Sequence, residues 1–218
     1  GTGLSSHELN QPGTYRDVTD TTVVAQFKVK KESSELFNEV NNDVHILAWT
    51  TTPWTLPSNT ALAVGRDIEY VLVKTFNQYT FKPVTVVLAR VLLEKNFGKK
   101  FVEGSDEDFA SYTSDSKTIP FKILKEFTGE KLAGTQYEQL ISWFTPNENP
   151  EKAFRVILGD FVTTEDGTGI VHIAPTFGAD DARVAKDAGI PPMLVRDEND
   201  NLVPLVDLQG KFIKGENV

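Results

Sequence analysis

The chain has 218 residues, of which 39% are hydrophobic and 24% are charged. This balance supplies a packed core and excludes global disorder. Because the chain has no cysteine, disulfides, thiol nucleophiles and zinc–cysteine sites are excluded. A formal net charge of −9 argues against autonomous nucleic-acid binding, which needs Lys and Arg to neutralise phosphates. No apolar run approaches the roughly 18 residues of a membrane span, and no secretory signal peptide is apparent.

The first half of the chain is expected to consist mainly of strands. Residues 1–19 are polar and turn-rich, which is typical of a connector. Apolar runs predict strands at 21–30, 45–49, 60–64 and 68–75, the last two as part of a meander. Apolar residues at helical spacing, followed by Gly98, predict a helix over 84–97.

The second half alternates between strands and turns, with one clear helix. Strands are predicted at 121–127, 154–162, 169–174, 193–196, 202–206 and 211–214. The segment Glu165-Asp166-Gly167 is expected to join two of them, 154–162 and 169–174, as a hairpin. A helix is predicted over 178–188, with Gly189 as its stop. The whole pattern predicts an α+β domain built on a strand-rich, barrel-like mixed sheet with a few helices.

Positive charge is concentrated in a few short segments of this acidic chain. They are residues 28–31, the pair Lys99 and Lys100, and Lys122 with Lys125. Each is a candidate RNA contact, but solvated surface is the simpler interpretation of any one of them.

The most distinctive stretch is residues 49–59, Trp-Thr-Thr-Thr-Pro-Trp-Thr-Leu-Pro-Ser-Asn. It follows a short apolar run, so three consecutive hydroxyls stand at the end of a predicted strand. Each hydroxyl can donate one hydrogen bond and accept two. Pro53 and Pro57 remove backbone donors and stiffen the segment. An ordinary exit from strand to loop, with threonine used for its strand propensity, remains an alternative.

A second stretch, residues 167–181, runs from a turn through a strand into the predicted helix. Together the two stretches resemble the editing (CP1) domain of isoleucyl-tRNA synthetase, a class I aminoacyl-tRNA synthetase. Residues 49–59 match the family pattern Trp-Thr-Thr-Thr-Pro-Trp-Thr-Leu-Pro-x-Asn at every fixed position. Residues 167–181 match Gly-Thr-Gly-x-Val-His-x-Ala-Pro-x-x-Gly-x-Asp-Asp. The sibling valyl and leucyl editing domains differ in the first motif, where Arg-Pro follows the paired threonines.

The resemblance implies catalytic roles for Thr50, Thr51, Thr52 and Asp181. The threonines would hold the terminal adenosine, the ester carbonyl and the attacking water. Asp181 would bind the free α-ammonium of the attached amino acid, since a carboxylate and an ammonium form a charge-assisted hydrogen bond. From the residues alone, an acid in the first helical turn that is stabilised by the helix dipole is the competing interpretation, and Asp180 fits it.

The resemblance also implies a set of substrate-binding residues. Trp54 and Thr55 would line the slot for the valine side chain, and His172 would border it. His172 would exclude the larger isoleucine by its bulk, while a general-base role is chemically open because its ordinary pKa lies near neutrality. Asn59 is included as a substrate contact, although an asparagine after Pro-Ser can simply fix a turn. Trp49 is expected in the core.

The function implied is hydrolysis of valine wrongly esterified to tRNA(Ile), with valyl-adenylate as a further substrate. The implied partners are the 3′ end of aminoacylated tRNA(Ile), its valine moiety and the remainder of the synthetase chain. The implied location is the cytoplasm, with no membrane partner. No cofactor or metal is expected, because His7, His45 and His172 are far apart and form no ligand pattern.

Two other functions remain open on the sequence. The chain could be a non-catalytic module that binds an RNA end, or a free-standing editing hydrolase; the acidic composition disfavours the second. Amino-acid activation is not expected, because the chain has no His-x-Gly-His and no Lys-Met-Ser-Lys-Ser pattern. Its only methionine is Met193, so we expect an excised piece of a longer polypeptide. Residues 1–14 would be a connector or cloning remnant, and 15–218 a single editing domain.

Overall fold

The structure is a computed structural model that describes residues 22–38, 40–207 and 211–212. Its strands are β1 (Val23–Lys28), β2 (Val44–Thr50), β3 (Ala61–Val64), β4 (Glu69–Phe76), β5 (Pro83–Ala89), β6 (Phe101–Glu103), β7 (Ile119–Thr128), β8 (Arg155–Leu158), β9 (Ile170–Ile173), β10 (Leu194–Arg196) and β11 (Leu202–Pro204). Its α-helices are α2 (Leu93–Phe97), α3 (Asp106–Ser111), α4 (Gly129–Leu132) and α5 (Ala179–Asp187). Short 3-10 helices are η1 (Lys31–Ser33), η2 (Glu35–Phe37), η3 (Pro53–Ser58), η4 (Arg90–Leu92), η5 (Gly98–Lys100) and η6 (Pro150–Lys152).

Nine of these strands form one mixed sheet, in the order β6-β7-β4-β5-β2-β9-β3-β8, with β1 added on β2. The pairs β2–β5, β2–β9, β3–β8 and β6–β7 are parallel, and the others are antiparallel. In the described part of the chain no pairing joins β6 to β8, so the path stays open. The predicted α+β class, a strand-rich mixed sheet with a few helices, is confirmed.

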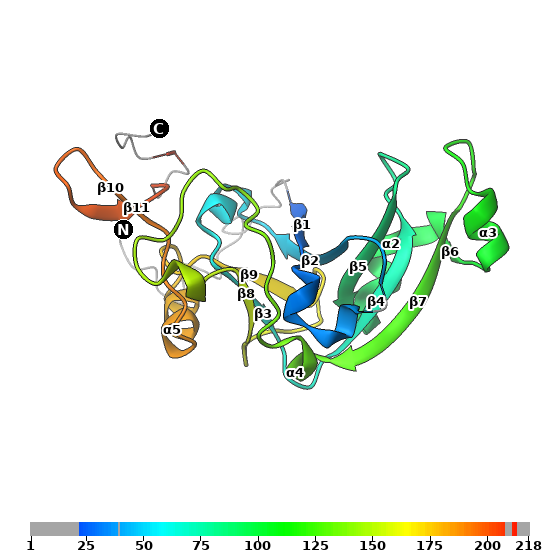
Figure 1. The fold of residues 1–218 in the computed structure, drawn as a ribbon, viewed down its shortest axis with the longest axis horizontal. Coiled ribbons are helices and arrows are strands. Elements are labelled where there is room, and N and C mark those ends of the chain that lie inside the picture. The colour runs from blue at the N-terminus through cyan, green and yellow to red at the C-terminus, as the bar shows by residue number, and fades with distance from the viewer. Residues whose placement is uncertain (1–21, 39, 208–210, 213–218) are drawn as a thin grey trace, which may run out of the picture.

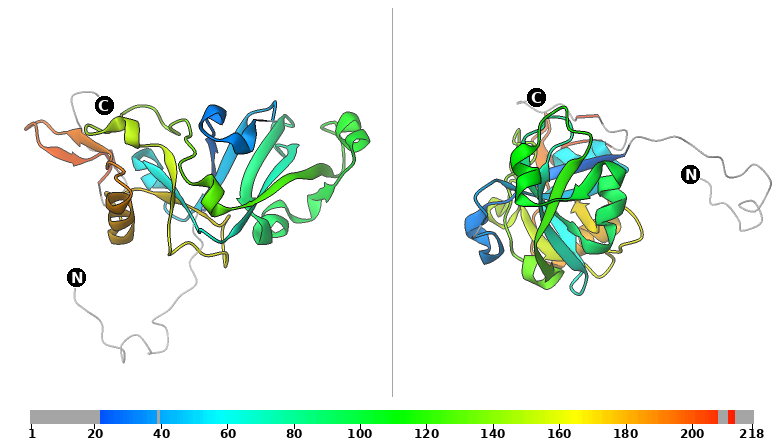
Figure 2. Two further views of the ribbon diagram at one scale, coloured as in Figure 1. Left: turned by 60° about the horizontal axis from the view of Figure 1, so that its bottom comes forward. Right: turned by 90° about the vertical axis from the view of Figure 1, so that its right-hand side faces the viewer.

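The molecule is elongated, and its two ends are built differently. Figure 1 shows the β10–β11 hairpin and α5 at one end, and β6, β7 and α3 at the other. The same separation is clear in the turned view of Figure 2. Strands β2, β3, β8 and β9 lie between the two ends. None of the helices in the described ranges has the length and apolar character needed to cross a bilayer.

Strand β2 lies at the centre because it is paired along both edges. β1 runs antiparallel to it over its whole length, β5 pairs with its first half, and β9 pairs at Trp49. Side chains alternate across a strand. Val44, Ile46 and Ala48 therefore enter the main core, whereas Leu47 joins a second apolar cluster over β4 and β5.

Helix α5 confirms the helix predicted over 178–188. Its Val184 and Ala185 are buried against apolar residues of β3, β8 and β9. The helix ends before Gly189, whose φ of +67° is a left-handed conformation that favours glycine. This packing fixes the first turn of α5 beside the end of β9.

The helix predicted over 84–97 is wrong in its first half. Residues 83–89 form β5, which is paired with β4 on one edge and with β2 on the other. The valines at 84, 86 and 87 are β-branched, and this favours a strand despite the apolar spacing. Only Leu93–Phe97 is α-helical, and it ends at Gly98 as expected.

The predicted hairpin between 154–162 and 169–174 is also wrong, as is the meander of 60–64 with 68–75. β3 lies between β8 and β9, so those two strands do not pair with each other. β4 pairs with β5 and β7 instead of β3. Local turn signals cannot reveal a strand from elsewhere in the chain inserted between two sequence neighbours. The predicted strands at 45–49, 121–127, 193–196 and 202–206 are confirmed within a few residues.

The predicted segment 211–214 is represented by one isolated bridge, between Val206 and Phe212, and its last two residues lie outside the described ones. The predicted connector, residues 1–14, also lies outside them. The single domain proposed for 15–218 stays a prediction.

Candidate functional site

A cavity of about 490 Å³ opens where β2 ends, beside β9 and the first turn of α5. Its lining combines both motifs of the sequence: Trp49, Thr50, Thr51, Thr52, Trp54, Thr55, Val171, His172, Ala174, Phe177, Gly178 and Asp181. The two stretches are far apart in the chain but meet because β9 pairs with β2 at Trp49 and Val171. All the predicted site residues except Asn59 therefore line one cavity.

The chain turns away from β2 into η3, and this turn orders the hydroxyls. Pro53 occupies the first position of η3, where its missing N–H costs no hydrogen bond. The Thr52 N–H donates to Thr50 Oγ1 at 3.0 Å, and the Thr55 N–H donates to the Thr52 carbonyl at 3.0 Å. The two bonds hold the threonines in a fixed arrangement around the turn.

Four side chains form one hydrogen-bonded row along the cavity wall. Thr50 Oγ1 lies 3.2 Å from Thr52 Oγ1, and Thr52 Oγ1 lies 3.3 Å from Thr55 Oγ1. Thr55 Oγ1 lies 2.9 Å from His172 Nε2. We call this set, Thr50, Thr52, Thr55 and His172, the hydroxyl row. Its members are buried or half-buried, so their dipoles are shielded from bulk water.

The hydroxyl row also indicates the tautomer of His172. Thr55 Oγ1 lies 2.8 Å from the Thr52 carbonyl, and a carbonyl can only accept. This contact uses the single hydroxyl proton of Thr55, so Thr55 accepts from a protonated His172 Nε2. The other ring nitrogen, Nδ1, is buried and has no partner among the described residues. Burial lowers the pKa of His172 to about 4, so the ring is neutral at pH 7.

Asp181 faces the cavity from the first turn of α5. Its Oδ2 accepts a hydrogen bond from the Ala174 N–H at 2.9 Å. No hydrogen bond of the described residues uses Oδ1 of this carboxylate. Burial raises the pKa of Asp181, although the Ala174 hydrogen bond acts in the opposite direction. By contrast, Asp180 is exposed and lies 3.7 Å from Arg183 Nη2.

The mouth of the cavity holds its most accessible residues. Thr51 is exposed, and no hydrogen bond of its hydroxyl is found in the described residues. Trp54 is 43% exposed, so much of its indole faces solvent. Both are therefore free to contact a ligand that enters. Trp49, which we expected in the core, is half-buried and forms part of the wall.

Asn59 does not lie in the cavity. Its side chain is buried; Nδ2 donates to the Ala61 carbonyl at 2.8 Å, and Oδ1 accepts from the Tyr137 hydroxyl at 2.7 Å. These bonds satisfy the amide within the protein. The structure thus places Asn59 outside the lining of the cavity, where the predicted substrate contact would lie.

The remaining wall residues were not singled out from the sequence. Val171, Ala174, Phe177 and Gly178 line the side of the cavity formed by β9 and the approach to α5. All four belong to the second motif, so their position within it was the available signal. They give the cavity an apolar part in addition to the hydroxyl row. No group of acidic and histidine side chains suited to a metal ion occurs in the described residues.

Comparison with known proteins finds relatives over almost the whole chain. No model of a protein family matches it. An isoleucine–tRNA ligase of Cytophaga hutchinsonii is 61% identical over 98% of this chain, and one of Bacteroides fragilis is 60% identical over 97%. The chain spans about 18% of the length of these relatives.

The fold has a counterpart among solved structures. A structure described as GlLeuRS-CP1 superposes with a TM-score of 0.50 at 16% identity, covering 78% of this chain and 65% of that one. At this identity the likeness concerns the fold alone. Together with the sequence relatives, it identifies the chain as a segment of the isoleucyl-tRNA synthetase family that has the fold of the class I editing (CP1) domain.

Proposed function

We propose that this chain hydrolyses the ester between valine and the terminal adenosine of tRNA(Ile). The observation that supports this most is the convergence of a carboxylate and a row of hydroxyls in one cavity of about 490 Å³. A valyl ester has a cationic amino group, a polar carbonyl and a branched apolar side chain. The cavity offers a matching environment for each of the three.

The carboxylate of Asp181 would bind the α-ammonium of the amino acid. Its Oδ2 is already held by the Ala174 N–H, which orients the group, and Oδ1 is left to accept from the ligand. Hydrogen bonds between charged partners are stronger than those between neutral ones. Partial burial strengthens the attraction further. This contact would select aminoacyl esters over esters without an amino group.

The hydroxyl row would position the ester and the attacking water. The oxygen of water adds to the ester carbonyl carbon, the bond from that carbon to the ribose oxygen breaks, and the ribose oxygen takes a proton. The products are free valine and a tRNA with a free hydroxyl. Hydroxyls that are fixed before the substrate arrives stabilise developing charge without reorganising. The accessible Thr51 and the ribose hydroxyl next to the ester are the candidates for orienting the water.

His172 would act as a wall of the side-chain slot. Its Nε2 is bonded to Thr55 and its Nδ1 is buried, so neither nitrogen is arranged to take a proton from water. This supports the steric role over the general-base role. A rigid imidazole held by Thr55 would leave room for valine and clash with the extra methylene of isoleucine.

A separate editing pocket meets a need that one binding site cannot meet. One methylene is worth only about 1–3 kcal/mol in an apolar pocket, a magnitude known from isoleucyl-tRNA synthetases rather than inferred from this chain. A second pocket that admits valine and excludes isoleucine multiplies the selectivity. Valyl-adenylate presents the same amino acid on an adenosine, so it would fit the same pocket.

The acceptor end of tRNA(Ile) would reach this cavity with help from the remainder of a synthetase chain. A net charge of −9 opposes RNA binding by this segment alone. A covalently attached tRNA-binding body would raise the effective concentration of the acceptor end. The reaction as proposed takes place in the cytoplasm and uses no cofactor, because water is the only co-reactant.

The experiment that tests this function compares two matched substrates. The chain is titrated with non-hydrolysable valyl- and isoleucyl-adenosine analogues, which need no tRNA delivery. Hydrolysis of valyl-tRNA(Ile) and isoleucyl-tRNA(Ile) is then followed under the same conditions. We expect tighter binding and faster hydrolysis of the valyl compound. Equal handling of both, or RNA binding without hydrolysis, would instead indicate a non-catalytic module.

A further inference from the structure

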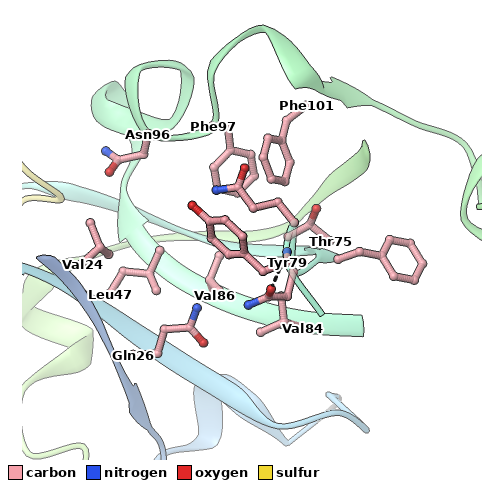
Figure 3. Close-up of a pocket in the computed structure, with 13 residues that line it drawn as sticks. Val24, Gln26, Leu47, Thr75, Tyr79, Val84, Val86, Asn96, Phe97 and Phe101 are labelled. Atoms are coloured by element: carbon pink, nitrogen blue, oxygen red, sulfur yellow. Dashed lines mark hydrogen bonds between the residues drawn. The ribbon is translucent and has the colours of Figure 1, made fainter. Parts of the chain in front are cut away.

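A second cavity, of about 340 Å³, lies on the sheet and shares no lining residue with the first one. Its floor is apolar and comes from β1, β2 and β5, while the loop between β4 and β5 and the α2–β6 segment form its sides. Figure 3 shows its lining side chains. We call it the aromatic cavity. None of its lining residues is charged.

An exposed tyrosine projects over this floor. Tyr79 is 81% exposed, and in Figure 3 its ring lies between Phe97 and the floor residues Val86 and Leu47. The backbone that carries it is fixed, because the N–H groups of Tyr79 and Thr80 both donate to Asn77 Oδ1, at 2.9 and 3.0 Å. A ring this exposed buries little apolar surface and so contributes little to the stability of the fold, but it offers a face on which a flat ligand can stack.

The opposite side of the cavity is a fixed aromatic wall. The rings of Phe97 and Phe101 lie 4.6 Å apart between centroids, and Phe97 also packs edge-on against Phe121 at 5.5 Å. The wall therefore keeps its shape while the Tyr79 side chain is free to adjust. A flat group could enter between the two.

Unused amide groups surround these rings. Gln26 and Gln78 line the cavity, and no side-chain hydrogen bond is found for either in the described residues. Asn96 donates through Nδ2 to the carbonyls of Leu92 and Gly167, at 2.9 and 2.8 Å, and its Oδ1 has no partner there. Amide donors and acceptors next to aromatic faces match the edge and the face of an unpaired nucleobase.

The aromatic cavity adjoins the site of the proposed hydrolysis. Val24 lines the aromatic cavity, and its partner across the β1–β2 ladder is Trp49, which lines the first cavity. Leu47 and Trp49 lie on the same face of β2, two residues or about 7 Å apart. The Asn96 bond to Gly167 ties α2 to the loop that packs against Trp49. The aromatic cavity is therefore within reach of the nucleotide next to one bound in the first cavity.

Free positive charge is present beside this cavity. Lys99 and Lys100 stand between Phe97 and Phe101 in the sequence, are exposed, and form no ion pair with any described residue. Most lysines of the other two basic segments are engaged. Lys28 pairs with Asp43 and Glu138, and Lys122 pairs with Asp106. Lys31 and Lys125 donate to the carbonyls of Val40 and Leu36. Among the three basic segments, 99–100 is therefore the one in which every lysine is available to bind a phosphate.

We propose that the aromatic cavity binds the base of the nucleotide that precedes the terminal adenosine, by stacking on Tyr79 and hydrogen bonding to the surrounding amides. This inference rests on the proposed function, because the adenosine in the first cavity sets the position of its neighbour. Stacking on an aromatic side chain tolerates any base.

The test uses three non-hydrolysable valyl analogues. The first is valyl-adenosine alone. The second is a valyl dinucleotide with one base-bearing nucleotide before the adenosine, and the third is the same valyl dinucleotide without that base. Their affinities are measured for the wild-type chain by calorimetry. We expect the base-bearing dinucleotide to bind about 5- to 150-fold more tightly than the one without the base. Tyr79→Ala should remove that gain, and Tyr79→Phe should keep it.

Controls separate this inference from the function it rests on. Trp143→Ala removes another exposed aromatic residue, which lines neither cavity, and should leave all three affinities unchanged. With 2-aminopurine as the base, fluorescence should fall on binding to wild type but not to Tyr79→Ala. An equal gain with and without the base would overturn the proposal, since it would come from the phosphate. If the valyl-adenosine analogue itself does not bind, the proposed function fails first and this inference falls with it.

Discussion

The two cavities share one face of the β1–β2 pair but are built from different chemistry. The first has hydroxyls that are already bonded to one another and to His172, and a carboxylate that is held by a backbone N–H. The aromatic cavity has an apolar floor, an exposed ring and two amide side chains, Gln26 and Gln78, without a partner in the described residues. A preorganised polar site suits a reaction in which charge develops at a defined point. An adaptable aromatic site suits a ligand that only has to be held. The difference teaches that neighbouring positions of one strand can contribute separately to catalysis and to ligand binding.

The largest expected effect is on the pH dependence of the free energy of unfolding, and it tests whether the imidazole of the first cavity is buried as the comparison of the two cavities requires. His172 has a pKa of about 4 in the folded chain, against an ordinary value of 6.5. The folded state therefore binds fewer protons than the unfolded state between these values. Stability contributed by this group is present above pH 6.5 and is lost as the pH falls towards 4, by up to about 3 kcal/mol. Denaturant unfolding at a series of pH values measures this.

His172→Gln is the matched variant for that measurement. It should remove most of the pH dependence in this window, while the contribution of His45, whose pKa is also lowered by burial, remains. An unchanged pH dependence in the variant would show that the imidazole is not buried as described, and the contrast with the open aromatic cavity would lose its basis.

Two adjacent acids sharpen the comparison next. Asp181→Asn should weaken binding of the valyl-adenosine analogue about 10- to 150-fold, because the hydrogen bond to a cationic partner loses its charge. Asp180→Asn, one residue away but exposed beside Arg183, should leave affinity unchanged. Calorimetry on both variants measures the difference. Equal losses would mean that only the general charge of the α5 terminus matters.

The pH dependence of that affinity has a definite sign. A protonated carboxyl cannot pair with an ammonium, so affinity should fall as the pH drops through the pKa of Asp181. Since burial raises that pKa, the fall should begin at a higher pH than for an ordinary aspartate. The Asp181→Asn variant should lack this dependence.

A substitution at Asn59 tests whether stability and substrate selectivity depend on different residues around the first cavity. Asn59→Ala leaves the buried Tyr137 hydroxyl without its acceptor, so stability should fall by about 1–3 kcal/mol. The ratio of valyl to isoleucyl analogue affinity should not change, because the side chain lies outside the cavity. Thermal unfolding and calorimetry measure the two quantities. A changed ratio at unchanged stability would restore Asn59 to the substrate contacts.

The smallest expected effect concerns selectivity. His172→Ala should lower the ratio of valyl to isoleucyl analogue affinity by about tenfold, near the lower end of what one methylene contributes. The loss should come mainly from better isoleucyl binding, because a wall has been removed. Weaker binding of both analogues at a constant ratio would contradict the steric role.

Site residues could be predicted from the sequence where their chemical type and the local secondary-structure pattern pointed to the same place. The threonines after an apolar strand and the acid in the first turn of α5 could be placed from their motifs, and the structure brings them into one cavity. The orientation of a side chain could not be predicted. Asn59 belongs to the same motif as Thr55, yet it turns towards Tyr137, 78 positions along the chain. Such a partner leaves no local trace in the sequence.

Strand order was the other quantity that the pattern could not supply. The run at 84–89 fits helical spacing, but its β-branched valines and its pairing with β2 and β4 make it a strand. β3 carries just four apolar residues, which give no sign that it separates β8 from β9. The aromatic cavity was missed for the same reason, because its lining comes from five separate segments of the chain.

The pairing of β2 with β9 also fixes when the site can exist during synthesis. Thr55 and His172 are 117 residues apart, and Asp181 comes later still. A nascent chain that has been synthesised only as far as β3 contains the threonines of the site but not yet Asp181. Its β3, whose four side chains are all buried in the finished fold, then lacks both of its partner strands. Until β8 and β9 emerge from the ribosome, both edges of this apolar strand are open to pairing with other chains. Translation that stalls between β3 and β9 would therefore yield an aggregation-prone product with no hydrolytic site.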